Sequence, residues 1–70
     1  MFRLQAEREK RRLSQSQLAR LADVHPSTLS RLESGKIYPY PAWRRRLGRT
    51  LGVSGDVLFE QVEPDEAGKA

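Results

Sequence analysis

The amino-acid sequence predicts an all-α fold, a compact bundle of five short helices around one small leucine-rich core. Apolar residues recur at helical spacing, as Trp43, Leu47 and Leu51 do at intervals of four, which places them on one helix face. Residues that start and stop helices separate these segments. Ser14 has the place of an N-cap, and Gly35 has the place of the left-handed residue that follows a helix. No internal repeat or second domain is visible.

The first helix is expected over residues 2–12, which contain good helix formers and neither glycine nor proline. Its inward positions are Phe2, Leu4 and Ala6.

Two more helices are expected over residues 15–22 and 26–33, joined by a tight turn. Ser14 and Gln17 make a capping box at the start of the first. The His25-Pro26 step starts the second, because proline suits the first helical position and disfavours helix in the residue before it. The inward positions of the two helices are Leu18, Ala19, Ala22, Leu29 and Leu32.

A loop over residues 36–41 contains two prolines, which keep it extended and stiff. The fourth helix is expected over residues 42–51, with Trp43 in the core rather than in a ligand cage.

The fifth helix begins at Ser54 and Asp56. Its expected inward positions are Val57, Leu58 and Val62. Val57, Phe59 and Val62 are also candidates for a dimer surface, and Phe59 is equally a candidate for the core. We expect residues 1–62 to form the domain. Residues 63–70, EPDEAGKA, have almost nothing to bury and are expected to be an acidic, disordered tail.

Composition limits the classes of function. A chain of 70 residues makes one small domain with a small core. It has no cysteine and one histidine, so we expect no disulfide and no metal site. The charged start is unlike a signal peptide, and no run approaches the ~20 apolar residues of a membrane span. We therefore expect a cytoplasmic protein without a membrane partner.

The charge of the chain is unevenly distributed. The net charge is +4, but residues 1–52 carry 12 Lys/Arg against four acidic residues, a net +8. Residues 53–70 carry one lysine against five acidic residues, a net −4. The basic part suits a polyanionic partner. Ordinary solubilising charge is the alternative interpretation of the same composition.

The 26–33 helix has an outward face of short polar side chains and one arginine: Ser27, Thr28, Ser30 and Arg31. A small polar face of this kind on a basic protein suits insertion into the major groove of DNA.

The run LSQSQLARLADVHPSTLSRLESGK resembles the helix-turn-helix of the phage repressor and Cro (XRE) family. The matching positions are Leu13, Ser14, Gln15, Leu18, Ala19, Val24, Leu29, Leu32, Glu33, Gly35 and Lys36. A second signature, Leu51-Gly52-Val53-Ser54 with Leu58, matches the last two helices of that family. The resemblance covers residues 3 to 60. It implies a lambda-repressor-like bundle in which the 15–22 and 26–33 helices form the helix-turn-helix.

The resemblance also implies roles for single residues. It places Gln15, Pro26, Ser27 and Arg31 at base-contacting positions. Because Pro26 has no donor and offers only apolar contact, base readout falls on Ser27, Thr28 and Arg31. Arg31 is expected to bind guanine, with a phosphate contact as its alternative. Gln15 is expected to contact phosphate or to support Arg31, and a Gln15 that is only solvated is the alternative.

Phosphate contacts are expected from a larger set: Ser14, His25, Ser34, Lys36, Tyr38, Tyr40 and Arg44. His25 is otherwise a simple turn residue, and either tyrosine could instead pack on Trp43. The resemblance further implies an ion pair between Arg8 and Glu33 that fixes the crossing of two helices. Two separate solvated charges are the alternative.

Taken together, the resemblance implies sequence-specific binding of double-stranded DNA by a small transcriptional regulator, a repressor of prokaryotic or phage origin. We expect a homodimer on DNA and no cofactor, small-molecule ligand or catalytic residue. The alternative is an antitoxin-like module that uses the same fold to bind a small partner toxin, with residues 60–70 as the binding segment.

Overall fold

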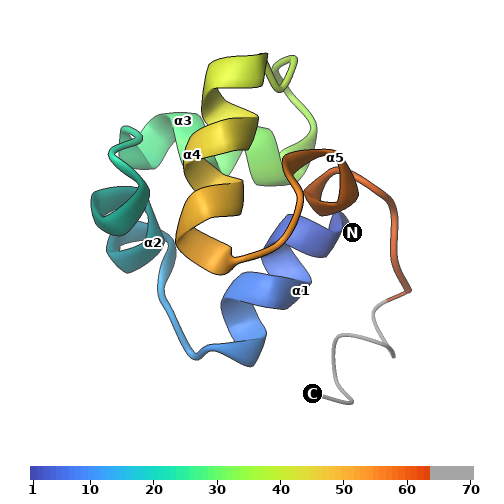
Figure 1. The fold of residues 1–70 in the computed structure, drawn as a ribbon, viewed down its shortest axis with the longest axis horizontal. Coiled ribbons are helices and arrows are strands. Elements are labelled where there is room, and N and C mark those ends of the chain that lie inside the picture. Colours follow the sequence, from blue (N-terminus) through green and yellow to red (C-terminus); the bar gives the residue numbers. More distant parts are fainter. Residues whose placement is uncertain (64–70) are drawn as a thin grey trace.

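The computed structural model describes residues 1–63, which form the expected all-α bundle (Figure 1). The five helices are α1 (Arg3–Lys10), α2 (Gln15–Ala22), α3 (Pro26–Ser34), α4 (Pro41–Leu51) and α5 (Gly55–Leu58). Helix α4 stands at the front of the view between α2 and α5, and α3 crosses behind it. The predicted all-α helix-turn-helix fold is confirmed.

The core consists mainly of leucines, and every helix contributes at least one. The largest fully buried side chains are Leu4, Leu18, Leu29, Leu32, Leu47 and Leu58. Fully burying one leucine stabilises a fold by about 1.5–3 kcal/mol, so these side chains supply much of the free energy that holds so small a domain. Trp43 and Phe59 lie half-buried at the edge of this core.

The turn between α2 and α3 follows from local chemistry. The predicted capping box is confirmed: the Gln17 backbone N–H donates to Ser14 Oγ at 3.0 Å, and the Ser14 N–H donates to Gln17 Oε1 at 2.8 Å. Asp23 ends α2 in the left-handed conformation, with φ of 56°. His25 then caps α3, with Pro26 at the first helical position.

Helix α1 is shorter than the sequence suggested, since it ends at Lys10 and not at residue 12. Arg12 adopts a left-handed backbone with φ of 57°, which turns the chain so that Leu13 packs against the core. A left-handed arginine is uncommon, and neither glycine nor proline marks the turn. The expected boundary was therefore wrong by two residues.

Helix α5 is also shorter than expected and contains only Gly55–Leu58. The chain beyond it turns at Phe59 and then pairs with the N-terminus, through an isolated bridge between Phe2 and Gln61. The Val62 N–H donates to the Met1 carbonyl at 2.8 Å. Val62 is buried, but through this pairing and not on a helix face. Phe59 packs edge-on against Phe2, with ring centroids 5.7 Å apart.

Close packing of α4 against α5 depends on two glycines. A Cβ atom added to Gly48 would lie 2.7 Å from the Val53 carbonyl oxygen. A Cβ atom added to Gly55 would lie 2.6 Å from the Arg44 carbonyl oxygen. Any larger residue would therefore separate the two helices. Of the expected acidic tail, Glu63 is described and exposed, and residues 64–70 lie outside the described part of the chain.

Candidate nucleic-acid interface

Helix α3 has one buried and one exposed face. Leu29 and Leu32 are buried in the core, whereas Pro26, Ser27 and Arg31 are exposed. Thr28 is half-buried beside them and Ser30 is exposed. Nine residues give a helix about 13 Å long, which is comparable with the ~12 Å width of the major groove of B-DNA.

Arg31 is the cation on this exposed face. Its guanidinium makes no ion pair with any carboxylate in residues 1–63. Its backbone carbonyl accepts hydrogen bonds from the Lys36 N–H at 2.9 Å and from Ser34 Oγ at 3.2 Å. These bonds satisfy the Arg31 carbonyl near the C-terminus of α3 and do not involve the side chain. The exposed guanidinium is therefore available to a ligand.

His25 and Ser27 form a small hydrogen-bonded unit at the start of α3. The Ser27 backbone N–H donates to His25 Nδ1 at 3.1 Å, which caps the helix. The Ser27 hydroxyl oxygen lies 2.8 Å from the same nitrogen. His25 is therefore a turn residue as well as a candidate phosphate contact.

Glu33 is the centre of a polar cluster beneath this face. It is buried at the end of α3, yet it accepts hydrogen bonds from two other helices. Arg8 Nε donates to its Oε2 at 2.7 Å and Arg8 Nη2 to its Oε1 at 3.1 Å, so the pairing is bidentate. Arg8 Nη1 also donates to the Leu13 carbonyl at 2.8 Å. The two charges form an ion pair, not two separately solvated groups.

Gln15 belongs to the same cluster. Its amide nitrogen donates to Glu33 Oε1 at 2.9 Å, and its side chain is half-buried. The expected support of Arg31 by Gln15 is replaced by support of Glu33. The Gln15 amide donates to Glu33 because a buried carboxylate is costly unless hydrogen bonds replace those it would make to water.

The segment between α3 and α4 contains an aromatic cluster. Tyr38 and Tyr40 are exposed, and their rings meet edge to face with centroids 4.9 Å apart. Tyr40 also packs against Trp43 at 5.7 Å. Lys36 is exposed at the start of this segment and lies beside the end of α3. Tyr40 therefore packs on Trp43 and remains more than half exposed.

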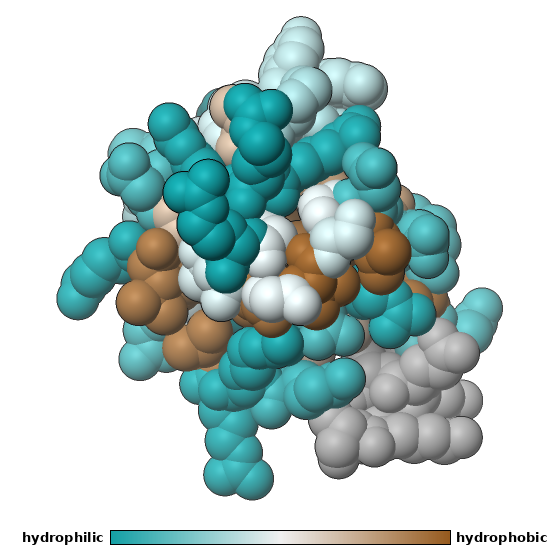
Figure 2. Space-filling model, viewed as in Figure 1, coloured by the Kyte–Doolittle hydropathy of each residue, from teal (hydrophilic) through white to brown (hydrophobic). Residues whose placement is uncertain are grey.

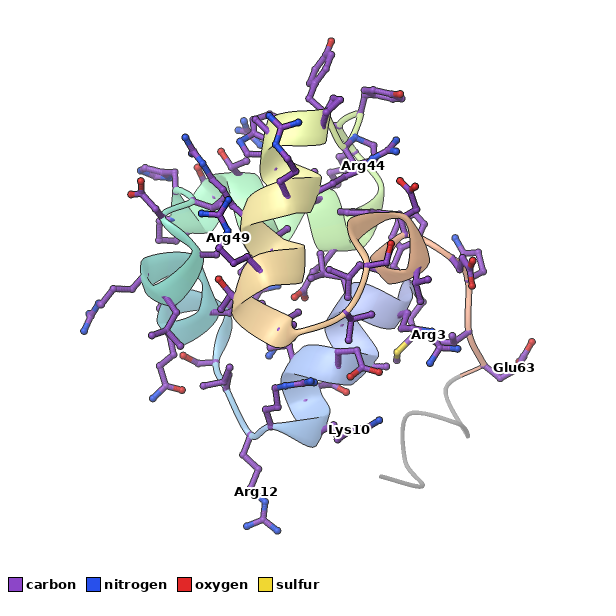
Figure 3. The ribbon with its side chains drawn as sticks, in the orientation of Figure 1. Arg3, Lys10, Arg12, Arg44, Arg49 and Glu63 are labelled. Carbon is purple, nitrogen blue, oxygen red and sulfur yellow. The ribbon has the colours of Figure 1, made fainter. Side chains whose placement is uncertain are left out.

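Arg44 differs from the other phosphate candidates because it is engaged within the protein. Its Nε donates to the Pro39 carbonyl at 2.7 Å and its Nη1 to Asp56 at 2.9 Å. Its guanidinium carbon lies 5.7 Å from the centre of the Tyr38 ring. Figure 3 shows Arg44 between α4 and α5. Arg44 therefore helps to hold the 36–40 segment, and its expected phosphate contact stays a prediction.

Three further arginines line the outer side of α4. Arg45, Arg46 and Arg49 are exposed, and Arg46 Nη1 donates to the Asp23 carbonyl at 3.1 Å. Figure 3 places Arg49 on the side of α4 that faces α2. Figure 2 shows hydrophilic side chains over most of this face, with separate hydrophobic patches at α2 and between α4 and α5.

Sequence reasoning missed a second polar cluster, which forms around Glu7, the residue of α1 that precedes Arg8. Glu7 is buried and accepts a hydrogen bond from Arg11 Nη1 at 2.7 Å. Arg11 Nη2 donates to the Leu51 carbonyl at the end of α4, also at 2.7 Å. The hydrogen bond from Arg11 lowers the pKa of Glu7, and the charge of Lys10 adds to this effect although burial opposes it. The i, i+4 spacing of Glu7 and Arg11 was the available signal.

Within residues 1–63, no group of three or more His, Cys, Asp or Glu side chains is arranged to hold a metal ion. None of the described helices is both long and apolar enough to cross a membrane.

The comparison with known families decides the class of the protein. Residues 2–60 match the family model of a helix-turn-helix domain. The chain belongs to the helix-turn-helix domain family. Such domains typically bind DNA and are not enzymes, so the family suggests DNA as the partner. No curated protein and no solved structure matches the chain.

Proposed function

We propose that this helix-turn-helix protein is a transcriptional regulator of the phage repressor and Cro type that binds double-stranded DNA sequence-specifically. In this arrangement α3 lies in the major groove and α2 crosses the backbone above it. The observation that carries the proposal is the exposed face of α3, where Ser27 and Arg31 are accessible and Arg31 has no carboxylate partner within residues 1–63. An arginine in that position can pair with both O6 and N7 of guanine.

Residues around α3 are the candidates for contacts with the phosphate backbone of DNA. Ser14, Ser34 and Lys36 are exposed at helix ends, and Tyr38 and Tyr40 extend the surface beyond α3. His25 adds a ring N–H donor, since its Nδ1 accepts from the Ser27 N–H and the proton of the neutral ring is then on Nε2. Contacts of this kind fix the register of a protein on DNA, while base contacts select the sequence.

We also propose that residues 1–62 form the DNA-binding domain and that two copies bind a near-palindromic site. One copy of α3 covers one half-site, and two-fold symmetric proteins place a second recognition helix one helical turn away.

Selection of bound duplexes from a random library tests the proposal. The expected result is one enriched sequence with two-fold symmetry. A salt series on that duplex should give a steep loss of affinity: if six phosphates are neutralised, log K falls against log salt with a slope of about −5. An unenriched library together with a salt-independent affinity would contradict the proposal.

A further inference from the structure

The His25–Ser27 unit at the start of α3 constrains the chemistry of the Ser27 hydroxyl. The Ser27 backbone N–H can only donate, so the His25 Nδ1 that it meets at 3.1 Å must offer a lone pair. The proton of the neutral ring then resides on Nε2.

This tautomer decides the direction of the second hydrogen bond. Ser27 Oγ lies 2.8 Å from the same Nδ1, which has no proton to give. The hydroxyl therefore donates its own single proton to Nδ1, whose one lone pair accepts both Ser27 donors in a bifurcated hydrogen bond. Both oxygen lone pairs remain free, and Ser27 is exposed. Toward a ligand it can act as an acceptor and not as a donor.

The base edges in the major groove differ in what they offer to such an acceptor. The adenine N6 amino group and the cytosine N4 amino group are donors, whereas guanine O6 and N7 and thymine O4 are acceptors. Ser27 is the second residue of α3, and the N-terminal residues of a recognition helix contact base edges.

We propose that His25 makes Ser27 an obligate acceptor, so that Ser27 reads an exocyclic amino group of adenine or cytosine. His25 is then a positioning residue that determines specificity without touching the base. This inference rests on the proposed function, because it assumes that α3 lies in the major groove.

The test uses the full chain and its selected duplex in mildly alkaline buffer, where imidazole is neutral. Ser27→Ala first identifies the base pair at which selectivity is lost. At that pair, adenine is replaced by purine or cytosine by pyrimidin-2-one, each of which lacks the amino group. Affinity of the unchanged protein should fall roughly 3- to 10-fold, the equivalent of one neutral hydrogen bond. Ser27→Ala should show no such dependence on the amino group, which controls for the weakened base pair.

Two variants of His25 separate this role from simple capping. His25→Asn keeps an acceptor at the N-cap and should retain the dependence on the amino group. His25→Gly keeps a tolerated N-cap but removes the acceptor, so the freed hydroxyl can donate and the dependence should shrink. In the Ser27→Ala background, His25→Gly should leave base preference unchanged. Thermal unfolding checks that each variant is folded.

The outcomes separate the proposed DNA binding from the proposed acceptor role of Ser27. If the selection enriches no sequence, the proposed function and this inference are both wrong. If it enriches a sequence but purine and pyrimidin-2-one bind as tightly as the parent bases, only the inference is overturned. The same holds if His25→Gly retains full dependence on the amino group, or if Ser27→Ala relaxes no position.

Discussion

Arg8 of α1 and Glu33 at the end of α3 form a bidentate ion pair, with Nε 2.7 Å and Nη2 3.1 Å from the two carboxylate oxygens. The Glu33 side chain is 4% exposed and that of Arg8 is 12% exposed. Gln15 of α2 donates to the same carboxylate. Glu33 therefore links the three helices that place the exposed face of α3.

Removal of either partner should destabilise the fold strongly. Arg8→Ala leaves a buried carboxylate without its cation, which costs about 3–5 kcal/mol. For a domain of this size the melting temperature should fall by more than roughly 10 °C. A double-mutant cycle with Glu33→Ala measures the coupling by thermal unfolding. Arg45→Ala is the matched control, because Arg45 is an exposed arginine. Its neighbour Arg46 is less suitable as a control, since it donates a hydrogen bond to the Asp23 carbonyl. Coupling near zero would show that the pair contributes nothing.

Arg31→Ala should affect specific binding alone. Loss of a bidentate guanine contact is expected to weaken the best site by about 1–3 kcal/mol and to flatten the preference at one base pair. The measurement compares the selected duplex with a scrambled duplex, and Arg45→Ala again serves as control. Equal weakening of both duplexes would mean that Arg31 contacts phosphate, which is the alternative that the sequence left open.

Arg44 and Lys36 should differ in their salt dependence. Lys36 is exposed beside the end of α3. Lys36→Ala is therefore expected to make the slope of log K against log salt shallower by about one unit. Arg44 is held by Pro39 and Asp56, so Arg44→Ala should leave the slope unchanged. It should instead lower stability by about 1 kcal/mol through the lost hydrogen bond to the Pro39 carbonyl.

A shallower slope for Arg44→Ala, with unchanged thermal stability, would restore Arg44 as a phosphate contact. Asp56→Asn provides the complementary test. It breaks the ion pair and leaves the Arg44 bond to Pro39 in place, so its effect on stability should be small because Asp56 is highly exposed.

Glu7 should contribute to loss of stability in acid. The hydrogen bond from Arg11 lowers its pKa in the folded state. The stabilisation is thus present above the ordinary glutamate pKa of about 4.3 and is lost as the pH falls through the lower folded-state value. Glu7→Gln should remove this part of the pH dependence. Denaturant unfolding of both proteins across the acidic range measures it, and identical slopes below about pH 4.3 would contradict the assignment.

Much of the fold follows from local sequence. The Ser14–Gln17 capping box, Pro26 at the first position of α3 and the left-handed Gly35 and Gly52 fix most helix boundaries, because each acts through bonds within a few residues. The outward face of α3 follows equally from its sequence. Once Leu29 and Leu32 turn inward, helical geometry leaves Ser27 and Arg31 outside.

Other features depend on residues far apart in the chain, and only the tertiary structure decides them. The chain after Leu58 leaves the helical conformation because Met1 and Phe2 offer it backbone partners. Arg44 bonds to Pro39 and Asp56 because the packing of the loop and α5 against α4 brings both within its reach, and Gln15 bonds to Glu33 because that carboxylate is buried beside it. The sequence by itself determines which helices form and which faces they bury, since those preferences are local. It leaves undecided which of several polar partners a long side chain selects, since that depends on distances set by the packing of whole helices.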